Sequence, residues 1–220
     1  PGYNNYEFQQ LRKYYTTYQF SNMYIIAETN GHLAVLALDS SMGNRITSNT
    51  QVQIDRIVDK IRSGSELIIS DMFFKDGNDS LPVCLFGHVI QRPASFVSGT
   101  IVMEIPATEI NRIMLQDNSQ IGLGKSGEAY LVGNDFLMRS ASRFINKSVL
   151  IVPVNTLPAE SALGGITGTA ISVDYRGIKV FSAYEPVSIP GLNWIVLAEI
   201  DYDEALIPVL DLRNDILLVS

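Results

Sequence analysis

The residue best suited to ligand chemistry is a carboxylate that ends a predicted strand beside aromatic side chains. Asp71 follows the apolar run 67–69 and precedes Phe73 and Phe74. A charged group next to aromatic walls is typical of small-molecule sites, which are largely apolar and carry a few placed polar groups. The alternative is a solvated surface aspartate, since most aspartates of folded proteins are exposed. Both interpretations stay open at the level of sequence.

Three more side chains are candidates for the same pocket. Phe86 and His88 alternate to one face of a strand predicted over 81–90, because successive strand residues point to opposite faces. They line the pocket if that face points toward the helix that covers the sheet. Tyr24 lies in another predicted strand and is a candidate of the same kind. The expected ligand-binding residues are therefore Asp71, Phe73, Phe86, His88 and Tyr24.

No catalytic or metal site is expected. His32 and His88 are the only histidines, and no nucleophile motif accompanies either, whereas a hydrolytic triad needs a base beside its nucleophile. The single cysteine, Cys84, excludes an internal disulfide and a cysteine-based zinc cluster, and its apolar surroundings predict a buried thiol. Asp76 and Asp79 lack the spacing of a calcium loop. We expect neither a metal nor a cofactor.

A glycine-rich stretch imitates two nucleotide-binding motifs. Residues 122–127 are GLGKSG, a literal G-x-G-x-x-G. The dinucleotide motif must follow a strand and open a helix, so that the helix N-terminus meets the pyrophosphate. Here a helix is predicted before the motif and a strand after it. A P-loop would need a glycine at the position of Ser119. These glycines are therefore predicted to make a turn.

The bulk composition is that of an acidic globular protein. Of 220 residues, 46% are hydrophobic and 18% charged, and the net charge is −7. This balance supports a core, and the length suits one large domain or two of about 100 residues each. Nucleic-acid binding needs clustered positive charge, so nucleic acid is not an expected partner. No apolar stretch reaches the roughly 20 residues of a membrane-spanning helix.

The first half of the chain predicts a five-stranded antiparallel sheet with helices on one side. An Asn-Gly pair at 30–31 is a hairpin signal, and Gly64 follows a helix with one apolar face. That face carries Val52, Ile54 and Ile57. The predicted helices span 3–20 and 52–61, and the predicted strands span 23–27, 33–38, 67–69, 81–90 and 97–105.

The second half predicts a shorter version of the same plan. A helix begins at Thr108, and a poorly patterned segment covers 140–168. Arg139 and Arg143 are predicted to make structural ion pairs that hold this segment. The predicted strands are 128–132, 136–138, 170–175, 178–184 and 193–200, and a last helix over 203–220 has acidic residues in its first turn, where they suit the helix dipole.

Two stretches carry a family resemblance. Residues 122–144, GLGKSGEAYLVGNDFLMRSASRF, and 182–201, SAYEPVSIPGLNWIVLAEID, strongly resemble the membrane-proximal module of double Cache (dCache) sensor domains. The first half resembles the distal module more loosely, through 23–31 and 69–73. It has no Arg-Gly-Trp-like element between Ile54 and Ile69, which departs from the amino-acid-binding pattern of the family. The resemblance therefore names no particular ligand.

The resemblance implies an α+β fold of two tandem PAS-like modules, each a five-stranded antiparallel sheet with flanking helices. The implied boundaries are a partial stalk helix over 1–20, a membrane-distal module over 21–106, a membrane-proximal module over 107–202 and an exit helix over 203–220. Such domains lie outside the cytoplasmic membrane, periplasmic or extracellular, between two transmembrane helices. The ligand usually sits in the distal module.

The implied function is extracytoplasmic small-molecule sensing for a transmembrane signal receptor. The expected parent is a two-component histidine kinase that works as a homodimer; the fragment itself is not expected to be an enzyme. A chemoreceptor, a nucleotide cyclase receptor, or a stand-alone binding or scaffold protein are the alternatives. Membrane attachment would come from flanking transmembrane helices outside these 220 residues.

Overall fold

The computed structural model describes residues 13, 16–29, 32–37, 46–75, 81–90, 99–115 and 123–219. Most of the stalk helix expected over 1–20 lies outside these residues. The chain divides into two compact units, the first comprising residues 1–109 with 190–192 and the second 110–189 with 193–220. The two units are described separately below.

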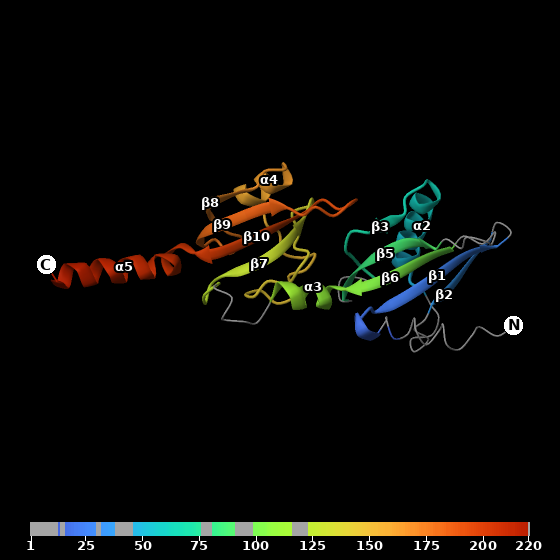
Figure 1. Ribbon diagram of the computed structural model, residues 1–220, viewed down its shortest axis with the longest axis horizontal. Coiled ribbons are helices and arrows are strands. Elements are labelled where there is room, and N and C mark those ends of the chain that lie inside the picture. Colours follow the sequence, from blue (N-terminus) through green and yellow to red (C-terminus); the bar gives the residue numbers. More distant parts are fainter. Residues whose placement is uncertain are drawn as a thin grey trace. The chain divides into compact units, whose positions relative to one another are not determined.

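The sheet of the first unit is antiparallel throughout, with strand order β2-β1-β6-β5-β3 and β4 paired to β5 (Figure 1). The five strands predicted for this half are all present. The sheet has six strands rather than five because the two residues of β4 also pair with β5. The strands are β1 (Asn22–Thr29), β2 (His32–Ala37), β3 (Leu67–Ile69), β4 (Phe73–Phe74), β5 (Pro82–Ile90) and β6 (Gly99–Pro106).

Helix α2 (Ser48–Arg62) packs against one face of this sheet. The Thr47 hydroxyl caps its N-terminus by accepting a hydrogen bond from the Thr50 amide, which satisfies a donor that the first turn leaves free. Ile54 and Ile57 are buried against the sheet, as predicted, whereas Val52 is 47% exposed and lies off the apolar face. Gly87 of β5 lies directly beneath the helix: a Cβ there would be 2.2 Å from Ile57 Cγ2. The absence of a side chain at 87 thus lets α2 approach the sheet.

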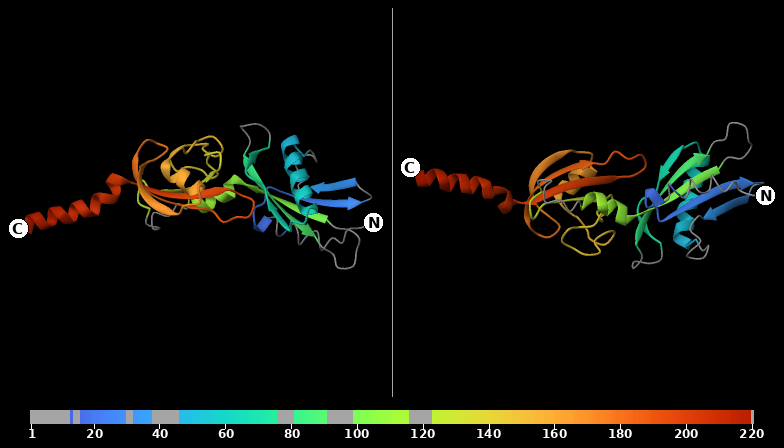
Figure 2. Two further views of the ribbon diagram at one scale, coloured as in Figure 1. Left: turned by 90° about the horizontal axis from the view of Figure 1, so that it is seen from above. Right: turned by 60° about the horizontal axis from the view of Figure 1, so that its bottom comes forward.

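The second unit has a four-stranded antiparallel sheet with strand order β7-β10-β9-β8 (Figure 2). Its strands are β7 (Glu128–Gly133), β8 (Gly168–Val173), β9 (Lys179–Pro186) and β10 (Trp194–Asp201). The predicted strand over 136–138 is wrong: Leu137 and Met138 make only isolated bridges. Phe136 has a φ of 62°, a left-handed conformation that interrupts an extended chain.

The segment 140–168, which shows little pattern in the sequence, contains helix α4 (Leu157–Leu163). Thr156 caps it through the Ala159 amide and a proline occupies its first turn, both ordinary signals of a helix start. Its buried face, Ala159 and Ala162, packs on Tyr130 and Leu197 of the sheet. The helix is short and mostly buried through alanine, so no 3.6-residue pattern of large apolar side chains marks it.

Arg139 holds the start of this segment. Its guanidinium is 2% exposed and pairs with Asp135 at 2.9 Å (Nη1 to Oδ1), so the predicted structural ion pair is confirmed for Arg139. Gly133 makes room for it, because a Cβ there would be 2.3 Å from the Arg139 guanidinium carbon. Arg143 instead donates to the backbone carbonyl of Gly127.

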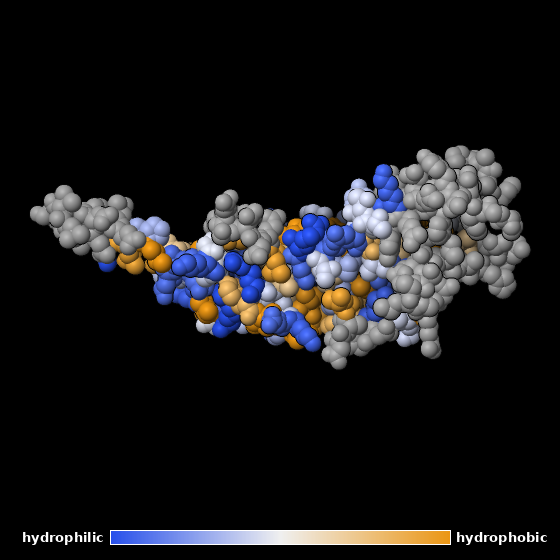
Figure 3. All heavy atoms as spheres, turned by 90° about the horizontal axis from the view of Figure 1, so that it is seen from below, coloured by the Kyte–Doolittle hydropathy of each residue, from blue (hydrophilic) through white to orange (hydrophobic). Residues whose placement is uncertain are grey.

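Two further helices follow strands without a linker. Helix α3 (Ala107–Met114) follows β6, and helix α5 (Tyr202–Val219) follows β10, close to the predicted exit helix. Within the described residues no helix is long and apolar enough to cross a membrane. Hydrophilic and hydrophobic residues are interspersed over the surface seen in Figure 3, as is usual where a folded chain meets water.

Candidate functional site

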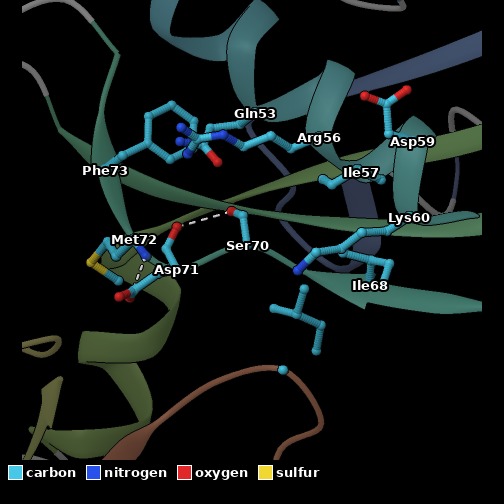
Figure 4. A pocket seen from close by; sticks show the side chains of 12 residues that line it. Gln53, Arg56, Ile57, Asp59, Lys60, Ile68, Ser70, Asp71, Met72 and Phe73 are labelled. Carbon is cyan, nitrogen blue, oxygen red and sulfur yellow. Dashed lines mark hydrogen bonds between the residues drawn. The ribbon is translucent and has the colours of Figure 1, made fainter. Parts of the chain in front are cut away.

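A cavity of about 460 Å³ lies in the first unit, between α2 and the chain from β3 to β4 (Figure 4). Its size is in the range of small-molecule sites. Four of the five lining residues from α2 lie on one helical face, since Gln53 precedes Arg56, Ile57 and Lys60 by three, four and seven residues. Those from α2 that point toward the cavity in Figure 4 are Gln53, Arg56, Ile57 and Lys60.

Two cations form the helix wall of the cavity. The Arg56 side chain extends toward Phe73, and the Lys60 ammonium extends toward Ser70 (Figure 4). Neither side chain forms an ion pair or hydrogen bond with any other residue that the structure describes. Asp59 also lines the cavity, but it pairs with Arg62 at 3.8 Å. The helix therefore offers two cationic groups to an occupant.

The opposite wall is the connection between β3 and β4, and it contains Asp71 and Phe73, two of the expected ligand-binding residues. Asp71 is exposed, and its Oδ1 accepts a hydrogen bond from the Met72 amide at 2.7 Å. Ser70 fixes this wall to the sheet: its hydroxyl accepts from the Leu85 amide at 2.8 Å and donates to the Asp71 carbonyl at 2.9 Å. Phe73 packs against the core below. The wall is thus held in place by the buried Ser70–Leu85 hydrogen bond and by two partly buried ones.

Phe86 and His88 do not line this cavity. Leu85 and Gly87 of β5 face α2, so the alternating residues Phe86 and His88 point to the opposite face of the sheet. His88 is exposed, and its Nδ1 lies 2.7 Å from the Val89 carbonyl. The condition under which these two were expected in the site is therefore not met.

Tyr24 is buried in the core rather than in the cavity lining. It is 2% exposed, packs with Ile54 and Ile57, and donates from its hydroxyl to Glu104 Oε2 at 2.9 Å. Glu104 is fully buried; its Oε1 accepts from Ser21 Oγ at 2.6 Å and pairs with Lys75 Nζ at 3.0 Å. A single glutamate within the apolar run of β6 was the sequence signal for this cluster, and sequence reasoning missed it.

Cys84 is buried, as predicted. Removal from water, followed by the negative charge of Asp71, raises the pKa of its thiol to about 12. A thiol with such a pKa is almost entirely protonated near neutral pH, so Cys84 is inert as a nucleophile.

The glycine-rich stretch forms a turn, as predicted, and the turn holds a carboxylate of the chain itself. Gly124 has a φ of 65°, which orients the two following amides toward one point. Lys125 N donates to Glu204 Oε1 and Ser126 N to Glu204 Oε2, each at 2.7 Å. Hydrogen bonding by the Ser126 side chain first, and then by the Lys125 and Ser126 amides, lowers the pKa of Glu204. The motif thus anchors the first turn of α5.

No family model matches the chain, and no curated protein matches it. Solved structures with the same fold exist. The ligand-binding domain of the amino-acid chemoreceptor PctB of Pseudomonas aeruginosa PAO1, in complex with L-Arg, is 14% identical with a TM-score of 0.61, over 97% of this chain and 79% of that one. The periplasmic sensory domain of the chemoreceptor Tlp1 of Campylobacter jejuni is 13% identical with a TM-score of 0.59, over 86% and 75%.

A third similar structure comes from a protein assigned as a histidine kinase rather than a chemoreceptor. The extracellular domain of rpHK1S-Z16, described as a histidine kinase, is 17% identical with a TM-score of 0.57, over 94% of this chain and 81% of that one. At these identities the similarity concerns the fold. The chain therefore has the α+β fold of extracytoplasmic sensor domains, which the two sequence stretches predicted.

Proposed function

We propose that this chain is the extracytoplasmic small-molecule-sensing domain of a transmembrane signal receptor. One observation carries the proposal: a fold shared with sensor domains of chemoreceptors and histidine kinases contains, in its first unit, a cavity of about 460 Å³ with charged walls. Asp71 and Phe73 are the expected binding residues that line it. The first unit would be the ligand-binding module.

The lining supports a small polar ligand with a negatively charged group. Arg56 and Lys60 offer hydrogen-bond donors and positive charge, and guanidinium groups match carboxylate geometry with two parallel bonds. Phe73 and Ile68 supply apolar contact, and Asp71 would receive a donor group of the ligand. We place Tyr24 behind this site as part of its core, and Phe86 and His88 outside it.

The test of the site is a thermal-shift screen with organic acids, amino acids, amines and purines. A ligand of the folded state raises Tm in proportion to its affinity. We expect a compound that raises Tm for the wild type to lose about tenfold or more in affinity in Asp71→Ala and in Arg56→Gln. Asp55→Asn is the control, because Asp55 is an exposed residue of the same helix that lies outside the cavity lining. A shift that is undiminished in both pocket variants would place the ligand elsewhere.

For output, we propose a receptor that crosses the membrane on both sides of this domain and works as a homodimer. A histidine kinase is the preferred parent and a chemoreceptor the alternative, since sensor domains of both kinds share the fold. The full reading frame decides the point. A reading frame without apolar spans upstream and downstream would favour a stand-alone binding protein. If both spans are present, the domain encoded after the second one would identify the type of receptor.

A further inference from the structure

The second unit buries two carboxyl groups side by side. Glu128 of β7 and Glu199 of β10 are directly paired across the two strands, so their Cβ atoms are about 5 Å apart. Glu128 is fully buried and Glu199 is 2% exposed. Like charges placed directly opposite each other in a sheet are destabilising even when solvated, and burial increases the effect because water no longer screens it.

The two carboxyls have unequal sets of hydrogen-bond donors. Glu128 accepts from the Tyr175 hydroxyl on Oε1 and from the Arg143 amide on Oε2, the latter at 3.1 Å. Glu199 accepts on Oε2 from the Tyr130 hydroxyl at 2.7 Å. Its Oε1 is buried without a hydrogen-bond partner among the described residues, and so is Ser182 Oγ. Ser182 is paired with Glu199 across β9 and β10, so these two partnerless oxygens belong to neighbouring residues.

No cation compensates the pair among the residues that the structure describes. The Arg143 guanidinium donates to the Gly127 carbonyl. Arg176 pairs with Asp174 at 2.6 Å and with Asp201 at 2.7 Å, and its guanidinium lies over the Phe144 ring. Two buried carboxylates without a cation are costly, and such groups ordinarily take up a proton instead.

The first unit supplies an internal comparison, because it repeats the tyrosine–glutamate geometry. Tyr24 is opposite Val102 and bonds Glu104 two residues further on; Tyr130 is opposite Leu197 and bonds Glu199 two residues further on. The residue opposite the glutamate differs. It is Asn22 for Glu104, where Lys75 also supplies a cation, and Glu128 for Glu199.

We infer that Glu128 and Glu199 share one proton in the folded protein near neutral pH, carried on Glu199 Oε1 and directed at Ser182 Oγ, and that this pair makes the second unit responsive to pH. One added proton removes the like-charge repulsion between the two carboxylates. Glu199 is the protonated member because its Oε1 has no donor among the described residues, whereas both oxygens of Glu128 accept a hydrogen bond.

Every element packed on Glu199 is consistent with this assignment. β7 presents Tyr130 and Glu128, β9 presents Ser182, and the turn after β8 presents Asp174, whose charge Arg176 balances. α4 packs Ala159 and Ala162 on Tyr130 and Leu197 of the same sheet and brings no charged group into that cluster. Burial first, and then the charges of Asp174 and Glu128, raise the pKa of Glu199, whereas the hydroxyls of Tyr130 and Ser182, which can donate to its charged form, oppose the rise.

The position of the pair links it to α5. Glu199 lies two residues before the end of β10 at Asp201, and α5 begins at the next residue, Tyr202. Loss of the proton would place two negative charges on β7 and β10 just before that helix. We therefore expect deprotonation to loosen the first turn of α5.

The experiment is a pH titration of the glutamate side-chain carboxyl carbons by NMR in the wild-type chain, assigned with Glu199→Gln. We expect Glu199 to titrate well above the ordinary glutamate pKa of about 4.3. Because the pKa of Glu199 is raised in the folded state, the folded protein keeps a proton that the unfolded chain loses. As the pH rises from the unfolded-state pKa to the folded-state pKa, the folding equilibrium constant should therefore fall by up to tenfold per pH unit. Glu199→Gln should remove that slope, and Glu160→Gln, on the exposed side of α4, should not.

Glu128→Asn is a second test, because it places an asparagine opposite Glu199, just as Asn22 is opposite Glu104 in the first unit. It should move the titration of Glu199 downward and slow amide exchange in the first turn of α5 at alkaline pH. Titration of Glu199 at the ordinary glutamate value would overturn the inference, as would a pH slope unchanged by Glu199→Gln. If Glu199→Gln does not fold, the titration of the wild-type chain alone tests the inference.

Discussion

The approach of α2 to its sheet depends on one glycine, and Gly87→Ala tests this. The new Cβ would be 2.2 Å from Ile57 Cγ2, about 1.5 Å closer than carbon atoms pack. Ile57 is 2% exposed, so it cannot move into solvent. Overpacking of this kind costs about 1–3 kcal/mol, and alanine recovers about 0.5–1 kcal/mol of the cost of glycine in a strand. We expect a net loss of about 0.5–2 kcal/mol.

The double variant is the sharper measurement. Ile57→Ala alone leaves a cavity and should cost about 2–5 kcal/mol. In Gly87→Ala/Ile57→Ala, the new methyl enters the space that Ile57 Cγ2 has left, so the loss should be smaller than the sum of the two single losses by about 1–2 kcal/mol. Such coupling is expected only for residues in contact. Urea denaturation with a common m-value provides the comparison, and strictly additive losses would refute the packing described for α2 and β5.

Two further predictions concern carboxylates that hold elements together. Glu104→Ala should destabilise the first unit by about 3–5 kcal/mol in urea unfolding, because it leaves the buried Tyr24 hydroxyl and the Lys75 ammonium without their acceptor; a loss below 1 kcal/mol would contradict the cluster. Glu204→Ala should accelerate hydrogen exchange at the amides of Lys125 and Ser126, which donate to that carboxylate, whereas Asp203→Ala should leave both rates unchanged. Equal protection in the two variants would show that the turn does not need Glu204.

The strands and the covering helix were predictable because their signals are local. The Asn-Gly pair, the apolar face around Ile54 and Ile57 and the turn at Gly124 each depend on a few adjacent residues. The family resemblance added the order of the two units. Helix α4 was not predicted, because its buried face is made of small residues, Ala159 and Ala162, which give little periodic hydrophobic signal.

The candidate site was predictable only in part, because the sequence of β5 does not show which of its two faces packs against α2. The run PVCLFGHVI of β5 is apolar on both faces, so alternation gives two sets of residues but does not say which set meets α2. Gly87 decides this by letting the helix approach, and a glycine gives no hint of its face. Asp71 and Phe73 line the cavity beside α2, and their role in ligand binding stays a prediction.

The two buried glutamates, Glu104 and Glu199, share a sequence pattern from which their partners could be predicted. Glu104 and Glu199 each stand near the end of an inner, apolar strand that continues into a helix, α3 or α5, without a linker. A charge at such a position needs hydrogen-bond partners from neighbouring strands. In both units one partner is a tyrosine on the adjacent strand, Tyr24 for Glu104 and Tyr130 for Glu199. The residue directly opposite the glutamate differs between the units: it is Asn22 for Glu104, which also pairs with the cation Lys75, and Glu128 for Glu199. The same tyrosine–glutamate arrangement therefore holds a cation in the first unit and, in our proposal, a proton in the second.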